Sequence, residues 1–139
     1  GDQSVLLIIT ISMKIIIILF IAFILVIGKA AKPPFDHPKA QEAITKCTKE
    51  HGIELKVLLD TLKTDKEDVK IKDYNFCIYK NSDCIGDDGK LKTDVLRSYF
   101  KIFYPGKEDL VADTCLKMKE NSVETTYGIS KCVTDLHLI

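Results

Sequence analysis

Five cysteines carry the clearest chemistry in this sequence, because thiols oxidise to disulfides, bind metals or act as nucleophiles. They are Cys47, Cys77, Cys84, Cys115 and Cys132 in a chain of 139 residues. No histidine stands at a spacing that favours a cysteine–histidine nucleophile. Two bridges with one leftover thiol allow fifteen arrangements, and the spacing alone does not choose among them.

An apolar run precedes the cysteines. Residues 15–27 read IIIILFIAFILVI, Met13 and Lys14 stand before them, and Gly28 and Ala30 follow. A positive charge, an apolar stretch of this length and small residues at positions −3 and −1 are typical of a secretory signal peptide. We expect residues 1–12 to lie upstream of the true start, 13–30 to be the signal peptide, and 31–139 to be the mature domain.

A membrane anchor is the alternative for the apolar run. Thirteen residues of helix span about 20 Å, whereas the hydrocarbon core is about 30 Å thick. If the upstream residues 5–12 are translated the apolar stretch is longer, but Lys14 interrupts it. The signal-peptide interpretation is favoured. It implies a secreted, extracellular protein, in which cysteines form disulfides.

The charge balance and the motifs exclude several functions. Removing Asp2, Lys14 and Lys29 leaves 18 basic and 19 acidic residues, a surface that does not suit nucleic acid. The sequence contains no motif of a hydrolase or a phosphate-binding loop, so no enzyme activity is expected. Its three histidines are far apart, and Lys92 stands where a calcium loop starting at Asn81 needs glutamate. We expect no metal and no cofactor.

The part of the chain after residue 30 is helical in pattern. Apolar residues recur at helical spacing, Pro38 suits a first helical position, and Gly52 suits a helix end. Thr64 and Glu67 form a capping-box pattern. The pattern predicts six short helices and no strand, a compact all-α fold. The expected helices are 38–52, 54–62, one from Thr64 to Asn81, 93–103, 107–120, and one from Asn121 or Ser122 onward.

The cysteine spacing resembles that of insect odorant-binding proteins. The intervals hold 29 residues between Cys47 and Cys77, 37 to Cys115, and 16 to Cys132, and Cys77-Ile-Tyr-Lys leads to an Asp87-Asp88-Gly89 turn. That family has six cysteines. Asp73 and Val123 occupy the places of its second and fifth cysteines, which form one disulfide, so the chain looks like the four-cysteine, "minus-C" type.

The resemblance implies two bridges, Cys47–Cys77 and Cys115–Cys132, in a bundle around an apolar cavity. Cys84 lies outside the family pattern. It is interpreted as a chance cysteine near a loop or a partner of Cys77 in another connectivity, with an intermolecular bridge or a reactive thiol as the alternative.

The resemblance also implies a secreted carrier of small hydrophobic odorants, pheromones or related lipids. The Tyr99 or Tyr127 hydroxyl is expected to meet a ligand oxygen, and the tail Leu136–Ile139 to close one mouth of the cavity. Expected partners are the small hydrophobic ligand and an olfactory receptor system, with a homodimer left open. The alternatives are a secreted venom or salivary effector and a structural domain without ligand. The residues expected to line the cavity are Leu55, Leu59, Phe76, Leu96, Tyr99, Phe100, Phe103, Val111, Met118 and Tyr127.

Overall fold

The computed structural model describes residues 2–30 and 37–137, with side chains described for 3–19 and 37–137. The chain divides into two units, residues 1–33 and 34–139. The first unit holds α1 (Asp2–Ala30), whose apolar side chains between Val5 and Leu19 are exposed. Across the described residues, no helix combines the length and apolar content that crossing a membrane requires. The predicted cleavage point after Ala30 borders residues 31–36, which lie outside the described residues.

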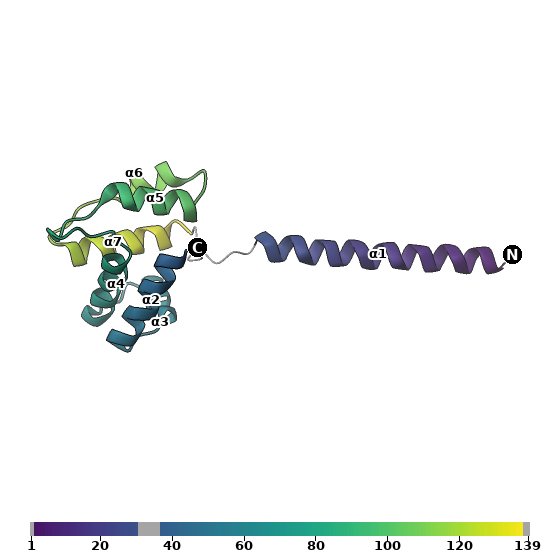
Figure 1. Cartoon of the computed structure of the whole chain (residues 1–139), viewed down its shortest axis with the longest axis horizontal. Helices are drawn as coiled ribbons and strands as arrows, with labels where there is room; N and C mark the ends of the chain where they lie inside the picture. The colour runs from purple at the N-terminus through teal and green to yellow at the C-terminus, as the bar shows by residue number, and fades with distance from the viewer. Residues whose placement is uncertain (1, 31–36, 138–139) are drawn as a thin grey trace. The chain divides into compact units, whose positions relative to one another are not determined.

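The second unit is built from helices, as predicted (Figure 1). Its described residues contain no strand, and one isolated bridge pairs Ile85 with Leu91. Two disulfides, Cys47–Cys77 and Cys115–Cys132, form as the family resemblance implies. The helices are α2 (Pro38–His51), α3 (Leu55–Leu62), α4 (Val69–Asn81), α5 (Thr93–Phe103), α6 (Glu108–Cys115) and α7 (Ser122–Asp135).

The ends of α2 follow directly from the sequence. Pro38 occupies the first helical position, where its missing N–H costs no hydrogen bond. Gly52 ends the helix with φ of 63°, a left-handed conformation that glycine adopts without steric penalty, and its N–H donates to the Thr48 carbonyl at 2.9 Å. Between these ends, Ala40, Ala43 and Cys47 form the buried face.

The start of α4 differs from the prediction. The capping box of Thr64 and Glu67 is wrong, because Asp68 caps the helix instead and accepts hydrogen bonds from the N–H groups of Lys70 and Ile71. The Thr64 hydroxyl donates to the Thr61 carbonyl at 2.8 Å. A carboxylate next to the exposed N–H groups of a helix start is a stronger cap than a distant hydroxyl.

Helix α6 is shorter than predicted. It ends at Cys115, whereas the sequence pattern suggested Glu120. The Lys119 N–H donates to the Thr125 hydroxyl at 2.9 Å, and Asn121 caps α7 in an extended conformation. These contacts hold the chain before α7 away from helical geometry, so Met118 lies outside α6.

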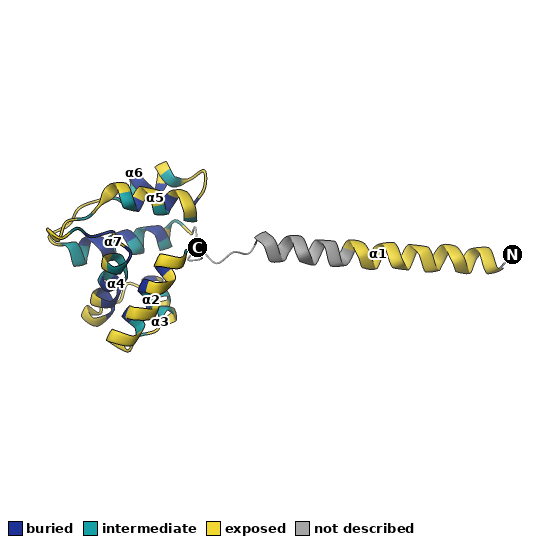
Figure 2. Ribbon diagram, viewed as in Figure 1, coloured by how far each residue is buried: buried dark blue, intermediate teal, exposed yellow. Residues whose placement is uncertain are grey.

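The buried side chains form two clusters, and α7, which contacts α3, α4 and α6, contributes residues to both. Figure 2 shows the buried residues on the faces that the helices turn toward one another. The N-terminal cluster comprises Cys47, Leu58, Leu62, Ile71, Tyr74, Cys77 and Tyr127. The C-terminal cluster comprises Cys84, Leu96, Phe100, Tyr104, Val111, Ala112, Cys115, Ile129 and Val133.

Candidate functional site

An apolar pocket lies where the two clusters meet. Helices α2, α3, α4, α5 and α7 all contribute side chains, and its cavity volume is about 120 Å³. A dry cavity of about 150 Å³ holds a benzene-sized molecule, so this pocket is of the size that accepts a small apolar ligand. The lining residues are Ala40, Ile44, Leu55, Leu58, Leu59, Leu62, Asn75, Ile78, Tyr79, Ser82, Cys84, Leu96, Tyr99, Phe100, Phe103, Tyr104, Ser130, Val133 and Thr134.

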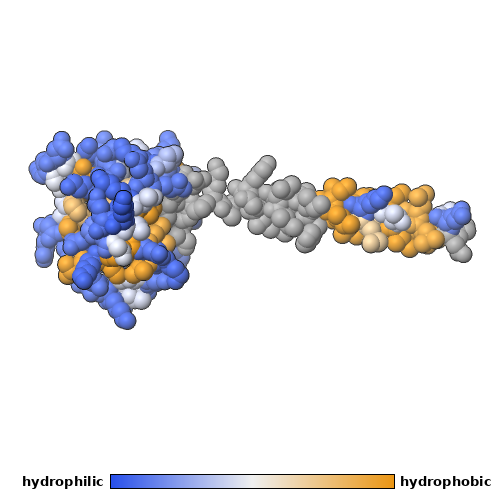
Figure 3. All heavy atoms as spheres, turned by 60° about the horizontal axis from the view of Figure 1, so that its bottom comes forward, coloured by the Kyte–Doolittle hydropathy of each residue, from blue (hydrophilic) through white to orange (hydrophobic). Residues whose placement is uncertain are grey.

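One face of the second unit is mostly polar. Figure 3 shows one face of residues 37–137 on which hydrophilic side chains predominate, with apolar atoms in patches between them. Apolar side chains concentrate instead in the clusters and in the pocket wall. The pocket therefore gives an apolar molecule an environment that the polar surface does not.

Six of the ten residues predicted to line a cavity do line this pocket. Leu55 and Leu59 lie on α3, and the other four come from α5, where they recur at helical spacing on one face. Tyr99 and Phe103 stack with ring centroids 5.7 Å apart. The four from α5 are Leu96, Tyr99, Phe100 and Phe103.

The other four predicted residues lie elsewhere. Phe76 is half-buried on α4 but is not among the residues that line the pocket, although its neighbours Asn75 and Ile78 are. Val111 is fully buried inside the C-terminal cluster, as ordinary core. Met118 is 60% exposed because α6 ends before it.

Tyr127 is buried in the N-terminal cluster, not in the pocket. Lys72 Nζ lies 5.5 Å from the centroid of its ring, a cation–π contact. The Tyr99 hydroxyl donates to the Ser82 carbonyl at 3.0 Å. Each of the two tyrosines expected to meet a ligand oxygen is thus placed for another contact. At the C-terminus Leu136 packs against the C-terminal cluster, and residues 138–139 of the predicted closing tail lie outside the described residues.

The sequence reasoning missed the polar part of the pocket wall. The polar lining residues Asn75, Tyr79 and Ser82 stand at spacings of four and seven, on one face of α4 and its C-cap, together with the apolar Ile78. That periodicity was available in the sequence, but an asparagine in it reads as solvent-exposed until the neighbouring helices are known.

Cys84 is a free, buried thiol that also lines the pocket. It is 3% exposed, and burial raises its pKa to about 12. A thiol that stays protonated at neutral pH is a weak nucleophile, and its burial keeps it from another chain. The structure therefore favours a chance cysteine over an intermolecular bridge or a reactive thiol. The other interpretation, that Cys84 pairs with Cys77, is wrong, because Cys77 pairs with Cys47.

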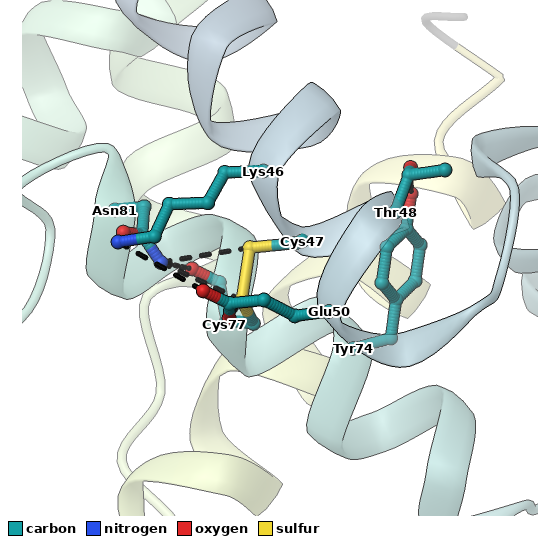
Figure 4. Close-up of a disulfide and its surroundings, with 7 residues drawn as sticks. All are labelled: Lys46, Cys47, Thr48, Glu50, Tyr74, Cys77 and Asn81. Atoms are coloured by element: carbon teal, nitrogen blue, oxygen red, sulfur yellow. Dashed lines mark hydrogen bonds and ion pairs between the residues drawn. A yellow bond between two sulfur atoms is a disulfide. The ribbon is translucent and has the colours of Figure 1, made fainter.

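The Cys47–Cys77 bridge joins α2 to α4 (Figure 4). Asn81 donates its side-chain N–H to the Cys77 carbonyl at 2.9 Å and lies 3.5 Å from both sulfur atoms. The Tyr74 and Thr48 hydroxyls hydrogen-bond at 2.8 Å. Glu50 and His51 also approach the Cys77 sulfur. That sulfur is held in a disulfide, so it offers no thiolate to a metal.

The model of the PBP/GOBP family, the insect odorant- and pheromone-binding proteins, matches residues 29–135. The chain belongs to the PBP/GOBP family. This is a family of binding proteins, and membership supports a carrier of small odorant or pheromone ligands in general. Among curated proteins, no match to the chain is found.

Proposed function

We propose that this PBP/GOBP family member is a secreted carrier that holds a small hydrophobic molecule in the pocket between its two clusters. The observation that supports this most directly is the pocket itself, lined mainly by aliphatic and aromatic side chains from five helices. Moving apolar ligand surface out of water contributes about 25 cal/mol per Å², enough for useful affinity without any charged contact.

The proposal includes secretion and the four-cysteine subtype. Residues 13–30 serve as the signal peptide, cleaved after Ala30, and 31–139 form the mature carrier. Support comes from the family match, which starts at residue 29, and from the division of the chain near residue 33. The subtype is supported by Asp73 and Val123 at the places of the absent cysteines. Sequencing the N-terminus of protein secreted by insect cells tests the cleavage, and any start other than Ala31 would contradict the assigned site.

Ligand binding is tested by filling the pocket from α3. Leu59 lines the pocket and Val57, on the same helix, is 46% exposed and outside it. We expect Leu59→Trp to weaken binding of the apolar fluorophore N-phenyl-1-naphthylamine by at least about tenfold, because the indole occupies the ligand's volume. The matched control, Val57→Trp, should bind as the unchanged protein does.

Titration of fluorescence and displacement by volatile ketones provide the measurement. Displacement that saturates with volatile ligands supports the carrier function over a structural domain without ligand. Equal binding by both tryptophan variants would place the ligand outside this pocket, and no saturable binding by the unchanged protein would refute the carrier function.

A further inference from the structure

Asn75 is a buried polar side chain in the wall of the apolar pocket. It is 2% exposed, and its Oδ1 accepts a hydrogen bond from the Ser130 hydroxyl at 2.8 Å. Its amide nitrogen Nδ2 is buried without a hydrogen-bond partner among the described residues. Since buried donors in folded proteins are nearly always paired, an unpaired one beside a pocket indicates a partner supplied from the pocket.

The direction of the hydrogen bonds from Tyr79 through Ser130 to Asn75 explains why Asn75 Nδ2 is the atom without a partner. The Tyr79 hydroxyl lies 2.9 Å from the Ser130 hydroxyl, and burial raises the Tyr79 pKa, so the phenol keeps its proton. If Tyr79 donates to Ser130, Ser130 donates to Asn75 Oδ1, and only Nδ2 lacks a partner. Reversing every donor would leave both the Tyr79 hydrogen and the Asn75 oxygen unpaired in a buried place.

Two other polar groups of the pocket wall are already engaged. The Tyr99 hydroxyl donates to the Ser82 carbonyl at 3.0 Å, and the Thr134 hydroxyl donates to the Ser130 carbonyl at 2.8 Å. Asn75 is anchored through Oδ1, which fixes its orientation, while Nδ2 keeps its capacity to donate. An anchored donor in an apolar wall discriminates strongly between ligands of the same shape.

We propose that Asn75 Nδ2 donates a hydrogen bond to an acceptor oxygen of the ligand, so that the pocket selects small carbonyl compounds over hydrocarbons of equal shape. The inference rests on the proposed carrier function, because it requires a ligand in this pocket. It replaces the tyrosine hydroxyls as the polar contact and names the class of ligand.

The test compares two ligands that differ in one atom group. Acetophenone and α-methylstyrene have the same shape, with a carbonyl oxygen in one and a methylene in the other. Their dissociation constants are measured by calorimetry on protein made from the full chain and on Asn75→Leu. We expect the preference for acetophenone, as the ratio of the two constants, to fall about three- to tenfold in the variant. Comparing ratios cancels the different hydrophobicity of the two ligands.

Thr134→Val is the matched control, because it also removes a polar group from the pocket wall at constant size. Its hydroxyl is already bonded to the Ser130 carbonyl, so the ligand preference should stay within about twofold of the original. A second measurement covers the case in which Asn75→Leu does not fold. The Asn75 side-chain amide resonance of the unchanged protein should shift on adding acetophenone and much less on adding α-methylstyrene.

The possible outcomes distinguish the role of Asn75 from the carrier function on which it rests. Binding of both ligands with a preference that Asn75→Leu leaves unchanged, or an amide resonance indifferent to the carbonyl, overturns the role of Asn75 and leaves the carrier intact. Failure of the unchanged protein to bind either ligand, or the fluorophore, overturns the carrier function itself. A lost preference in Asn75→Leu alone supports the inference.

Discussion

The N-terminal and C-terminal clusters are each crosslinked by one disulfide, whereas non-covalent contacts join the two clusters to each other. Cys47–Cys77 ties α2 to α4 within the first, and Cys115–Cys132 ties the end of α6 to α7 beside the second. We call α2–α4 and α5–α7 the two halves of this unit, and the boundary between them the seam. The side-chain contacts described across the seam are non-covalent. They include the ion pair of Lys72 with Glu124 at 3.0 Å and the hydrogen bond from Ser130 to Asn75. The pocket lies along this seam, where opening breaks no covalent bond.

In the proposed four-cysteine alignment, the absent disulfide of the six-cysteine pattern would cross the seam. Asp73 lies on α4 and Val123 on α7, so a bridge there would join the two halves. The residues next to them, Lys72 and Glu124, form the ion pair instead, and the Glu124 hydrogen bond raises the pKa of Lys72. Each half is therefore held rigid by a covalent bridge, whereas the two halves are held to each other by contacts that can break and re-form.

The largest expected effect is on the alkylation rate of Cys84, the free, buried thiol of the C-terminal cluster. Burial raises its pKa from 9.0 to about 12. At pH 8, alkylation by iodoacetamide should be about a thousandfold slower in the folded protein than in the unfolded chain, since the thiolate fraction falls accordingly. The folded protein's rate should keep rising with pH toward 12. A rate that levels off near pH 9 would show that the thiol is not buried as described.

Removing one bridge at a time tests whether the halves are stapled independently. Cys47→Ala with Cys77→Ala, and Cys115→Ala with Cys132→Ala, should each lower the free energy of unfolding by about 3–4 kcal/mol, the first pair more because its loop is longer. Hydrogen exchange should accelerate mainly in the half that lost its bridge. Equal acceleration in both halves would contradict the division at the seam.

Restoring the bridge across the seam should stabilise the fold, and by less than its loop length alone implies because engineered disulfides commonly deliver less than loop closure predicts. Asp73→Cys with Val123→Cys should raise the melting temperature, with a gain of about 2–4 kcal/mol in the free energy of unfolding if the geometry is unstrained. Ligand should also enter more slowly, because the pocket opens along this seam. Mass spectrometry that finds no new disulfide would remove the basis for placing the absent cysteines at these two positions.

The ion pair across the seam should account for the smallest effect. Lys72→Met keeps the length of the buried side chain but loses the ion pairs with Glu124 and Glu67 and the cation–π contact with Tyr127. It should cost about 1 kcal/mol in denaturant unfolding. The difference should vanish as the pH rises well above 10.5, because the raised pKa of Lys72 confines the ion pair's contribution to the protonated ammonium. Lys56→Met, which removes an exposed pair with Asp60, is the control and should be silent.

The sequence predicted the helices well and the pocket wall in part. Pro38 and Gly52 set the ends of α2 through backbone geometry that holds in any tertiary context. The start of α4 and the end of α6 were missed because local signals competed there. Asp68, and not the predicted capping box of Thr64 and Glu67, caps α4. The end of α6 depends on the hydrogen bond from Lys119 to Thr125, which forms only when α7 is in place.

The sequence by itself determined where most of the helices lie and that α5 presents one apolar face, and its family resemblance pointed to the four bridged cysteines. Only the tertiary structure decided what each apolar face packs against. Val111 and Phe100 are both buried in the C-terminal cluster, yet only Phe100 also lines the pocket. Asn75 became a candidate ligand contact only once Ser130 and Tyr79 lay beside it. The physical reason is that periodicity marks a face as buried, whereas a cavity depends on how closely several faces, distant in sequence, fill the space between them.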